Sequence, residues 1–187
     1  MNEIPKILEK DENSLWYGKP KILAFFARQI LGIVVTFIII LGFLVIMPTL
    51  SSYLFHIVVI FILLLVYCFL QYRIANYSIT NKRVIFQSGI IGRDFKIIDF
   101  DKIQNMHVTV GIVDKIFNTG TINIFSGKKI QTKYGMQLVY DKMEYIENPY
   151  EVFKKIKKTS FDIKTDIEFP NKYRPKQAGD YGTEHKP

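Results

Sequence analysis

Charged side chains are missing from the middle of the 187-residue sequence. Between Arg28 and Arg73 there is no Asp, Glu, Lys or Arg, although 22% of the residues in the whole chain are charged. One helix over a run of this length would measure roughly 65 Å, about twice the hydrocarbon thickness of a bilayer. The run is therefore expected to fold back on itself, and Pro48 with the hydroxyl residues that follow marks the turn.

The turn divides the neutral run into residues 29–47 and 53–72, each close to the roughly 20 residues that a membrane crossing requires. A cleaved signal peptide would explain only the first of these segments. Two successive uncharged runs are also not expected as buried helices in so short a soluble protein. The sequence therefore predicts a transmembrane α-helical hairpin that follows an N-terminal segment, residues 1–28.

Basic residues lie at both outer ends of the predicted hairpin, and its turn has none. They are Lys19, Lys21 and Arg28 before it, and Arg73, Lys82 and Arg83 after it. Because basic residues near a span favour the cytoplasmic side, both termini are predicted to be cytoplasmic and the chain to lie in the plasma membrane. Trp16 and Tyr17 are expected in an aromatic belt at the interface.

Side chains that could carry chemistry are few. A single cysteine, Cys68, excludes an internal disulfide and a thiolate zinc site. The three histidines, His56, His107 and His185, cannot be paired by local spacing, and no phosphate-binding loop or dinucleotide motif is present. The sequence therefore predicts no enzyme and no metal, cofactor or small-molecule substrate. His56 and Cys68 are expected to be packing residues within the hairpin.

After residue 74 the sequence changes to short stretches rich in Ile, Val, Phe, Tyr and Thr, separated by Gly, Asn and Asp. This texture predicts an antiparallel sheet. Seven strands are expected, at residues 75–80, 83–88, 94–100, 106–110, 121–125, 129–133 and 137–141. Turns are expected at 81–82 and 89–92, with a hairpin tip at 126–128. Glu144 and Glu147 are expected in a solvated loop.

The end of the domain carries a helix signal. Asn148 and Pro149 are typical of an N-cap and first helical position, and Val152, Phe153 and Ile156 then share one face. This helix is expected to cover the open end of the strands. Residues 161–187, with their prolines and glycines, are predicted to form a flexible tail.

Positive charge is concentrated in the predicted β domain. Residues 73–160 contain fifteen basic and eight acidic side chains, nearly all of the net charge of +8. Next to an anionic leaflet, each nearby Lys or Arg can add about 1 kcal/mol of attraction. Lipid phosphate is favoured over nucleic acid because the domain begins directly after a span. The candidate headgroup contacts are Arg73, Lys82, Arg83, Lys128 and Lys129.

Several short stretches in a fixed order resemble the bacterial pleckstrin-homology (PH) membrane-protein family, across residues 16–158. They lie at 16–20, 77–85 with 89–90, 103–106, 117–122 and 147–149. The residues that carry the resemblance are Trp16, Gly18, Pro20, Tyr77, Thr80, Gly89, Gly120 and Pro149. It implies a PH-like seven-stranded antiparallel barrel or sandwich at residues 73–160, capped by a C-terminal helix. Members of this family generally lack an assigned activity or ligand.

Within this resemblance, Thr80 and Asn81 are expected to shape a turn that places Lys82 and Arg83 beside the headgroups. Gly89 and Gly120 are expected where a Cβ would obstruct the backbone or a close approach. The functional prediction is a non-enzymatic scaffold or adaptor with a protein partner or a second copy of the chain. The alternative is a sensor of anionic lipid headgroups.

Overall fold

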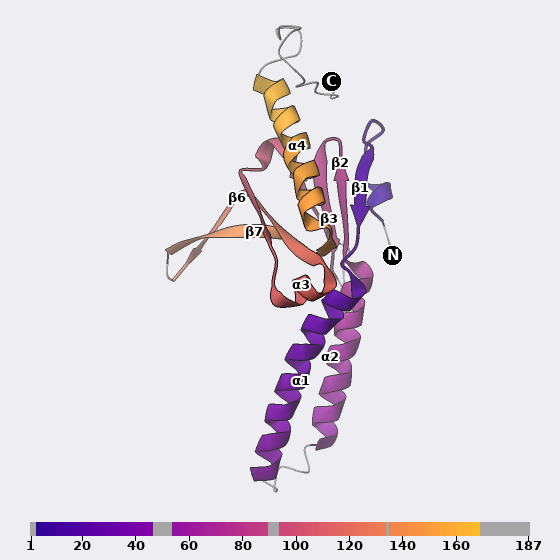
Figure 1. Cartoon of the computed structure of the whole chain (residues 1–187), viewed down its shortest axis with the longest axis vertical. Helices are drawn as coiled ribbons and strands as arrows, with labels where there is room; N and C mark the ends of the chain where they lie inside the picture. Colours follow the sequence, from indigo (N-terminus) through magenta and orange to yellow (C-terminus); the bar gives the residue numbers. More distant parts are fainter. Residues whose placement is uncertain (1–2, 47–53, 90–93, 134, 169–187) are drawn as a thin grey trace.

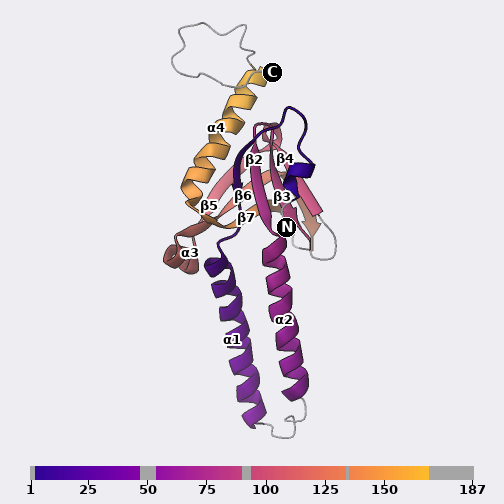
Figure 2. The ribbon, with the colours of Figure 1, turned by 90° about the vertical axis from the view of Figure 1, so that its right-hand side faces the viewer.

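Two long helices form a stalk that carries a β domain at one end (Figures 1 and 2). The computed structural model describes residues 3–46, 54–89, 94–133 and 135–168. Helices α1 (Ile22–Ile46) and α2 (Leu54–Ile74) run side by side. Their segments Ile22–Phe43 and Phe55–Ile74 are long and apolar enough to cross a membrane, by length and composition alone. The stalk is thus compatible with membrane association.

The domain contains two antiparallel sheets, and no closed barrel forms among the described residues. The first has the order β1 (Ser14–Gly18), β2 (Asn76–Thr80), β3 (Arg83–Ser88), β4 (Asp94–Asp99). The second has the order β5 (Asn105–Thr109), β6 (Thr119–Thr132), β7 (Gly135–Glu147). Helix α4 (Pro149–Glu168) covers them. The predicted PH-like fold with a capping helix is confirmed.

Strand β1 precedes α1 and pairs with β2, which follows α2. Gly18 lies opposite Tyr77, and Ser14 lies opposite Thr80. The helical hairpin is therefore an insertion between two neighbouring strands of one sheet. The sequence analysis did not predict β1. It also placed Trp16 in an aromatic belt, whereas its ring packs over Gly18 and against the domain core, because alternate side chains of a strand share a face.

The predicted hairpin tip at residues 126–128 is wrong, because β6 continues through it as a bulge. Gly127 has a φ of +86° there, and a Cβ on it would lie 2.8 Å from Nε2 of Gln104. The predicted strands 121–125 and 129–133 are consequently one strand. The described residues still form seven strands, because β1, which was not predicted, replaces the one that merged.

Glu144 and Glu147 lie in β7 and not in a loop. Asn81 and Lys82 form the predicted turn between β2 and β3. Gly89 has a φ of +94°, as expected of a residue where a Cβ is unfavourable. Most of the turn predicted at 89–92 lies outside the described residues.

The core lies between the two sheets and under α4. Its buried side chains are Tyr77, Ile79, Val84, Phe86, Ile98, Phe100, Ile103, Ile122, Ile124, Met143, Ile146, Val152 and Ile156. Ser160 donates a hydrogen bond of 3.0 Å to the carbonyl of Phe100, and Lys164 donates one to the carbonyl of Ile103. These bonds hold α4 on the domain beyond residue 160. The predicted tail is therefore wrong for residues 161–168, which are helical.

A short helix, α3 (Ile112–Phe117), links β5 to β6 and lies against α1. The sequence analysis did not predict it. Buried Asp114 accepts hydrogen bonds of 2.9 Å from the Gly111 amide and from the Thr119 hydroxyl. The same carboxylate thus fixes both ends of α3.

Gly120 of β6 lies close under Pro149, the first residue of α4. A Cβ there would lie 2.7 Å from Cγ of Pro149, which agrees with the expected close approach. We expect Gly120→Ala to destabilise the folded chain by about 1–3 kcal/mol, because α4 must move away from β6. Thermal unfolding of the full chain in detergent measures this loss. Gly42→Ala, whose Cβ would meet no atom within 4 Å, is the control, and equal melting temperatures for the two variants would contradict the packing argument.

Candidate functional site

The described residues contain no group of three or more His, Cys, Asp or Glu side chains that could hold a metal ion. His56 lies on α2 of the stalk, and His107 lies on β5, where its ring packs edge-on to Tyr140 at 5.1 Å. His185 is outside the described residues. The exposed surfaces of the molecule are therefore the candidates for a functional site.

Lys82 and Arg83 lie at the end of β2 that is remote from the stalk. β2 begins two residues after α2 ends and runs away from it for five residues (Figure 1). At about 3.3 Å per strand residue, the turn lies more than about 15 Å from the end of α2. This position of Lys82 and Arg83 gives no support to the contact with lipid headgroups that was expected from the sequence.

Both cations are held by two acids of the N-terminal segment, Glu9 and Glu12. The Arg83 guanidinium donates to both carboxylate oxygens of Glu12, at 2.9 Å from Nε and 2.7 Å from Nη2. Nζ of Lys82 lies 3.0 Å from Glu9 Oε2. Burial alone would raise the pKa of Glu12, but hydrogen bonds from Arg83 and Thr80 outweigh it and hold that pKa below its ordinary value.

The neighbouring motif residues hold the same N-terminal segment. The Thr80 hydroxyl donates to Glu12 at 2.7 Å. The Asn81 side chain accepts from the Asn13 amide at 3.0 Å and donates to the Asp11 carbonyl at 3.2 Å. The turn that was expected to present cations to lipid therefore fastens residues 9–13 to the sheet.

The remaining predicted cations lie elsewhere. Arg73 is exposed on the last turn of α2, at the domain end of the stalk. Lys128 and Lys129 are exposed on β6, and neither is in an ion pair within the described part of the chain. The five predicted headgroup residues are thus spread over three places and do not form one patch.

Lys129 belongs to a projecting two-stranded ribbon, residues 129–132 of β6 and 135–138 of β7 (Figure 1). No third strand pairs with the ribbon in the described part of the chain, where β5 pairs with residues 121–125 of β6 and stops short of the ribbon. Three of its large apolar side chains are exposed, Ile130 by 45%, Met136 by 71% and Leu138 by 49%. Sequence reasoning missed this surface because it split β6 at the bulge.

The domain is joined to the stalk through a bulge in β7. Buried Tyr145 has a φ of 56° there and packs edge-on against Phe25 of α1, with ring centroids 5.7 Å apart. Its carbonyl accepts a hydrogen bond of 2.8 Å from the Lys21 amide. The Tyr77 hydroxyl accepts one of 3.2 Å from the amide of Glu144. Burial raises the pKa of Tyr77 to about 12, so this hydroxyl stays protonated at neutral pH.

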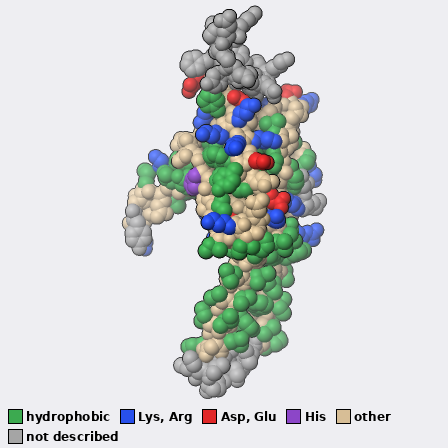
Figure 3. Space-filling view, in the orientation of Figure 1, with side chains coloured by type: hydrophobic (Ala, Val, Ile, Leu, Met, Phe, Trp, Pro, Cys, Tyr) green, Lys and Arg blue, Asp and Glu red, His purple; other side chains and the backbone are tan. Residues whose placement is uncertain are grey.

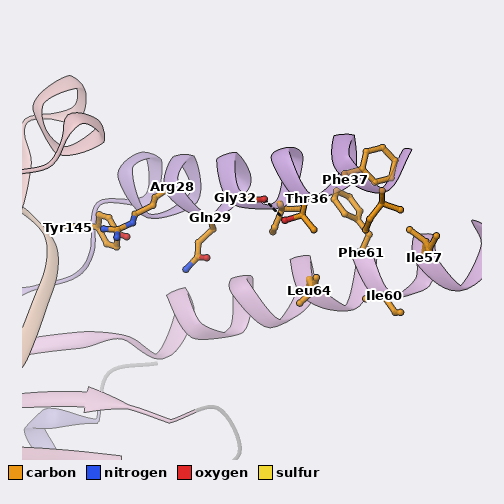
Figure 4. Close-up of a pocket in the computed structure, with 12 residues that line it drawn as sticks. Arg28, Gln29, Gly32, Thr36, Phe37, Ile57, Ile60, Phe61, Leu64 and Tyr145 are labelled. Carbon is orange, nitrogen blue, oxygen red and sulfur yellow. Dashed lines mark hydrogen bonds between the residues drawn. The ribbon is translucent and has the colours of Figure 1, made fainter. Parts of the chain in front are cut away.

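A groove with a volume of about 380 Å³ runs between α1 and α2 (Figure 4). Arg28, Gln29 and Tyr145 line the end next to the domain. The rest of the lining is Gly32, Ile33, Thr36, Phe37, Ile40, Ile57, Ile60, Phe61 and Leu64. The Thr36 hydroxyl donates to the Gly32 carbonyl at 2.9 Å, so the groove beyond Gln29 is essentially apolar.

Residues 22–148 match the family model of the bacterial PH domain, and the chain belongs to this family. Among solved structures, the comparison matches a DUF1696 family protein with a pleckstrin-homology domain from Shewanella loihica PV-4. It is 14% identical over 46% of this chain and 70% of that chain, with a TM-score of 0.34. No curated protein matches the chain. PH domains are in general non-catalytic modules for interaction or lipid binding.

We expect Arg83→Ala to destabilise the protein by about 3 kcal/mol, because it leaves the buried carboxylate of Glu12 unpaired. Glu9→Gln, at the exposed end of the same cluster, should change stability little. Thermal unfolding of the full chain in detergent at pH 7 compares the two variants. Equal losses would contradict the assigned role of Glu12.

The pH dependence follows from the lowered pKa of Glu12. The unfolded chain binds the proton first as the pH falls, so this stabilisation is complete above about pH 4.5 and is lost through the lower pKa of the folded state. Glu12→Gln should therefore melt below the wild type at pH 7, and the difference in melting temperature should be smaller at pH 3. Melting curves that stay separated by the same interval at both pH values would contradict this.

Proposed function

We propose that the chain is an integral protein of the plasma membrane whose PH-like domain acts as a non-enzymatic scaffold on the cytoplasmic side. The projecting ribbon is the observation that carries this proposal. A lone two-stranded ribbon is marginally stable in water, and its exposed apolar side chains favour burial against a partner. The proposed partner is a protein with an apolar surface rimmed by acidic groups.

Membrane insertion of the stalk is supported by its surface. Figure 3 shows hydrophobic side chains along the described part of the stalk, whereas basic and acidic side chains gather on the domain. Only 11% and 6% of the two apolar helix segments are buried inside the protein. Burying this surface in lipid removes a large free-energy penalty, at about 25 cal/mol per Å² of apolar area. Arg28 and Arg73 at the domain end favour a cytoplasmic domain.

The charges of the ribbon support an acidic partner. Lys129 and Gln131 of β6 lie opposite Leu138 and Met136 of β7, so these four side chains share one face. The apolar members supply area for docking, and the cation adds attraction and orientation. Lys128 and Lys133 extend the positive charge along the strand.

Anionic-lipid binding is the second candidate, and three exposed cations favour it. Arg73, Lys128 and Lys129 are the residues that we retain for it. Lys82 and Arg83 are left out because they are paired with Glu9 and Glu12 at the remote end of the sheet.

Photo-crosslinking in native membranes tests the scaffold. We expect Met136→Ser with Leu138→Ser to lower the yield of the crosslinked partner by at least about tenfold, as for the central residues of an interface. Phe161→Ser, an equally exposed apolar side chain on α4, should leave the yield unchanged. A yield that is insensitive to the ribbon variant would contradict the proposal, as would recovery of the chain in the soluble fraction.

The lipid candidate is tested with a fluorophore on the ribbon. The full chain is used because residues 73–160 alone would lack β1. Cys68→Ser with Gln131→Cys provides one labelling position, and the labelled chain is placed in nanodiscs with or without phosphatidylglycerol. Lipid binding predicts a blue shift with phosphatidylglycerol that high salt and Lys128→Glu with Lys129→Glu abolish. Emission that is independent of lipid charge would leave the protein partner as the ribbon's ligand.

A further inference from the structure

The groove between α1 and α2 has the length of one leaflet. From Arg28 to Ile40 the lining spans thirteen residues of α1, and the rise between the first and the last is about 18 Å. The hydrocarbon core of a bilayer is about 30 Å thick, so each leaflet contributes about 15 Å. An extended acyl chain of the leaflet next to the domain therefore fits along the groove.

The two ends of the groove differ in polarity in the way that the two parts of a phospholipid do. Arg28, Gln29 and Tyr145 lie at the domain end, and the lining from Gly32 onward is apolar apart from the Thr36 hydroxyl, which is satisfied within its helix. The lining includes no acidic side chain. The charge of the site is therefore complementary to an anionic headgroup.

Arg28 is placed to bind a phosphate. Its side chain is exposed and lies beside Tyr145 at the mouth of the groove (Figure 4). A guanidinium has five N–H donors in a planar fork that matches phosphate oxygens. Tyr145 is itself buried against Phe25, so the domain forms one wall of the groove at this end.

Gly32 opens the groove directly below this end. A Cβ at Gly32 or at Gly42 would meet no atom within 4 Å, so neither glycine marks a close contact between the two helices. The missing side chain of Gly32 instead leaves space in the lining, whereas Gly42 is not part of the groove.

We propose that one anionic phospholipid binds in this groove, with its phosphate on Arg28 and one acyl chain between α1 and α2. This inference rests on the membrane insertion proposed above, but not on the ribbon or its partner. The polar side chains of Arg28, Gln29 and Tyr145 then lie at the headgroup end of the lipid, and the two helices hold its acyl chain by apolar contact. Arg28 supplies the preference for anionic over zwitterionic lipid.

Native mass spectrometry of the full chain, purified in mild detergent and supplied with phosphatidylglycerol, tests the site. We expect one retained phosphatidylglycerol per chain and about tenfold weaker retention in Arg28→Gln, the loss of a charged hydrogen bond. Gly32→Phe fills the groove and should lose the lipid. Gly42→Phe adds the same side chain outside the groove and should retain it. Lys19→Gln removes an exposed cation that lies just before α1 and outside the groove lining, and it should also retain the lipid.

The outcomes separate this site from its rivals. No retained lipid in the wild type, equal behaviour of the two glycine variants, or an equal effect of Arg28→Gln and Lys19→Gln would overturn the proposal. A dimer without lipid that Gly32→Phe converts to a monomer would assign the groove to a second copy of the chain. A photoactivatable acyl chain provides a second readout, because it should label the groove-lining segments of α1 and α2. The yield of crosslinks from the ribbon should not change in these variants, so crosslinking tests the scaffold proposal independently of the lipid site.

Discussion

The pairing of β1 with β2 is the contact on which the arrangement of the whole chain depends. These strands flank the two stalk helices in sequence, and their ladder brings the start of α1 and the end of α2 to the same edge of the domain. Closing a connection of more than fifty residues has an entropic cost, but that cost rises only slowly with length. The helices themselves shorten the gap because they fold back side by side. Stalk and domain are therefore one topological unit.

The bulge in β7 fixes the domain to the first helix of the stalk. An extra residue in one strand turns Tyr145 out of the sheet toward α1, and it leaves the Glu144 amide without a ladder partner. The buried hydroxyl of Tyr77, from the other sheet, accepts a hydrogen bond from that amide. Lys21 adds an ion pair of 2.8 Å to Glu147. One irregularity thus links both sheets and the first stalk helix.

The strongest sequence signals concern long or periodic features. The uncharged run predicted two apolar helices, and the alternation of β-branched residues predicted most of the strands after residue 75. Asn148 and Pro149 predicted the start of α4. Local patterns failed where a distant partner decides the structure. β1 exists because residues 76–80 pair with it, and Gly127 forms a bulge because Gln104 packs against it.

The candidate sites were harder to predict than the fold. Lys82 and Arg83 are close to the stalk in sequence, but a strand of five residues carries them to the far end of the sheet. Their acidic partners come from the segment before α1, more than seventy residues away, and no local pattern indicates such a contact. The groove depends on which faces of two uniformly apolar helices meet. A sequence with little amphipathic periodicity does not specify those faces.

The β1–β2 ladder also limits how the two helices can move. Sliding α1 along α2 would shift the register of these strands, and a slip of one residue would turn every side chain of β1, including Trp16, to the opposite face. Piston-like displacement of one helix is therefore blocked at the domain. If the stalk spans a bilayer as proposed, a change in bilayer thickness must tilt the two helices together, and the domain then changes its angle to the membrane surface.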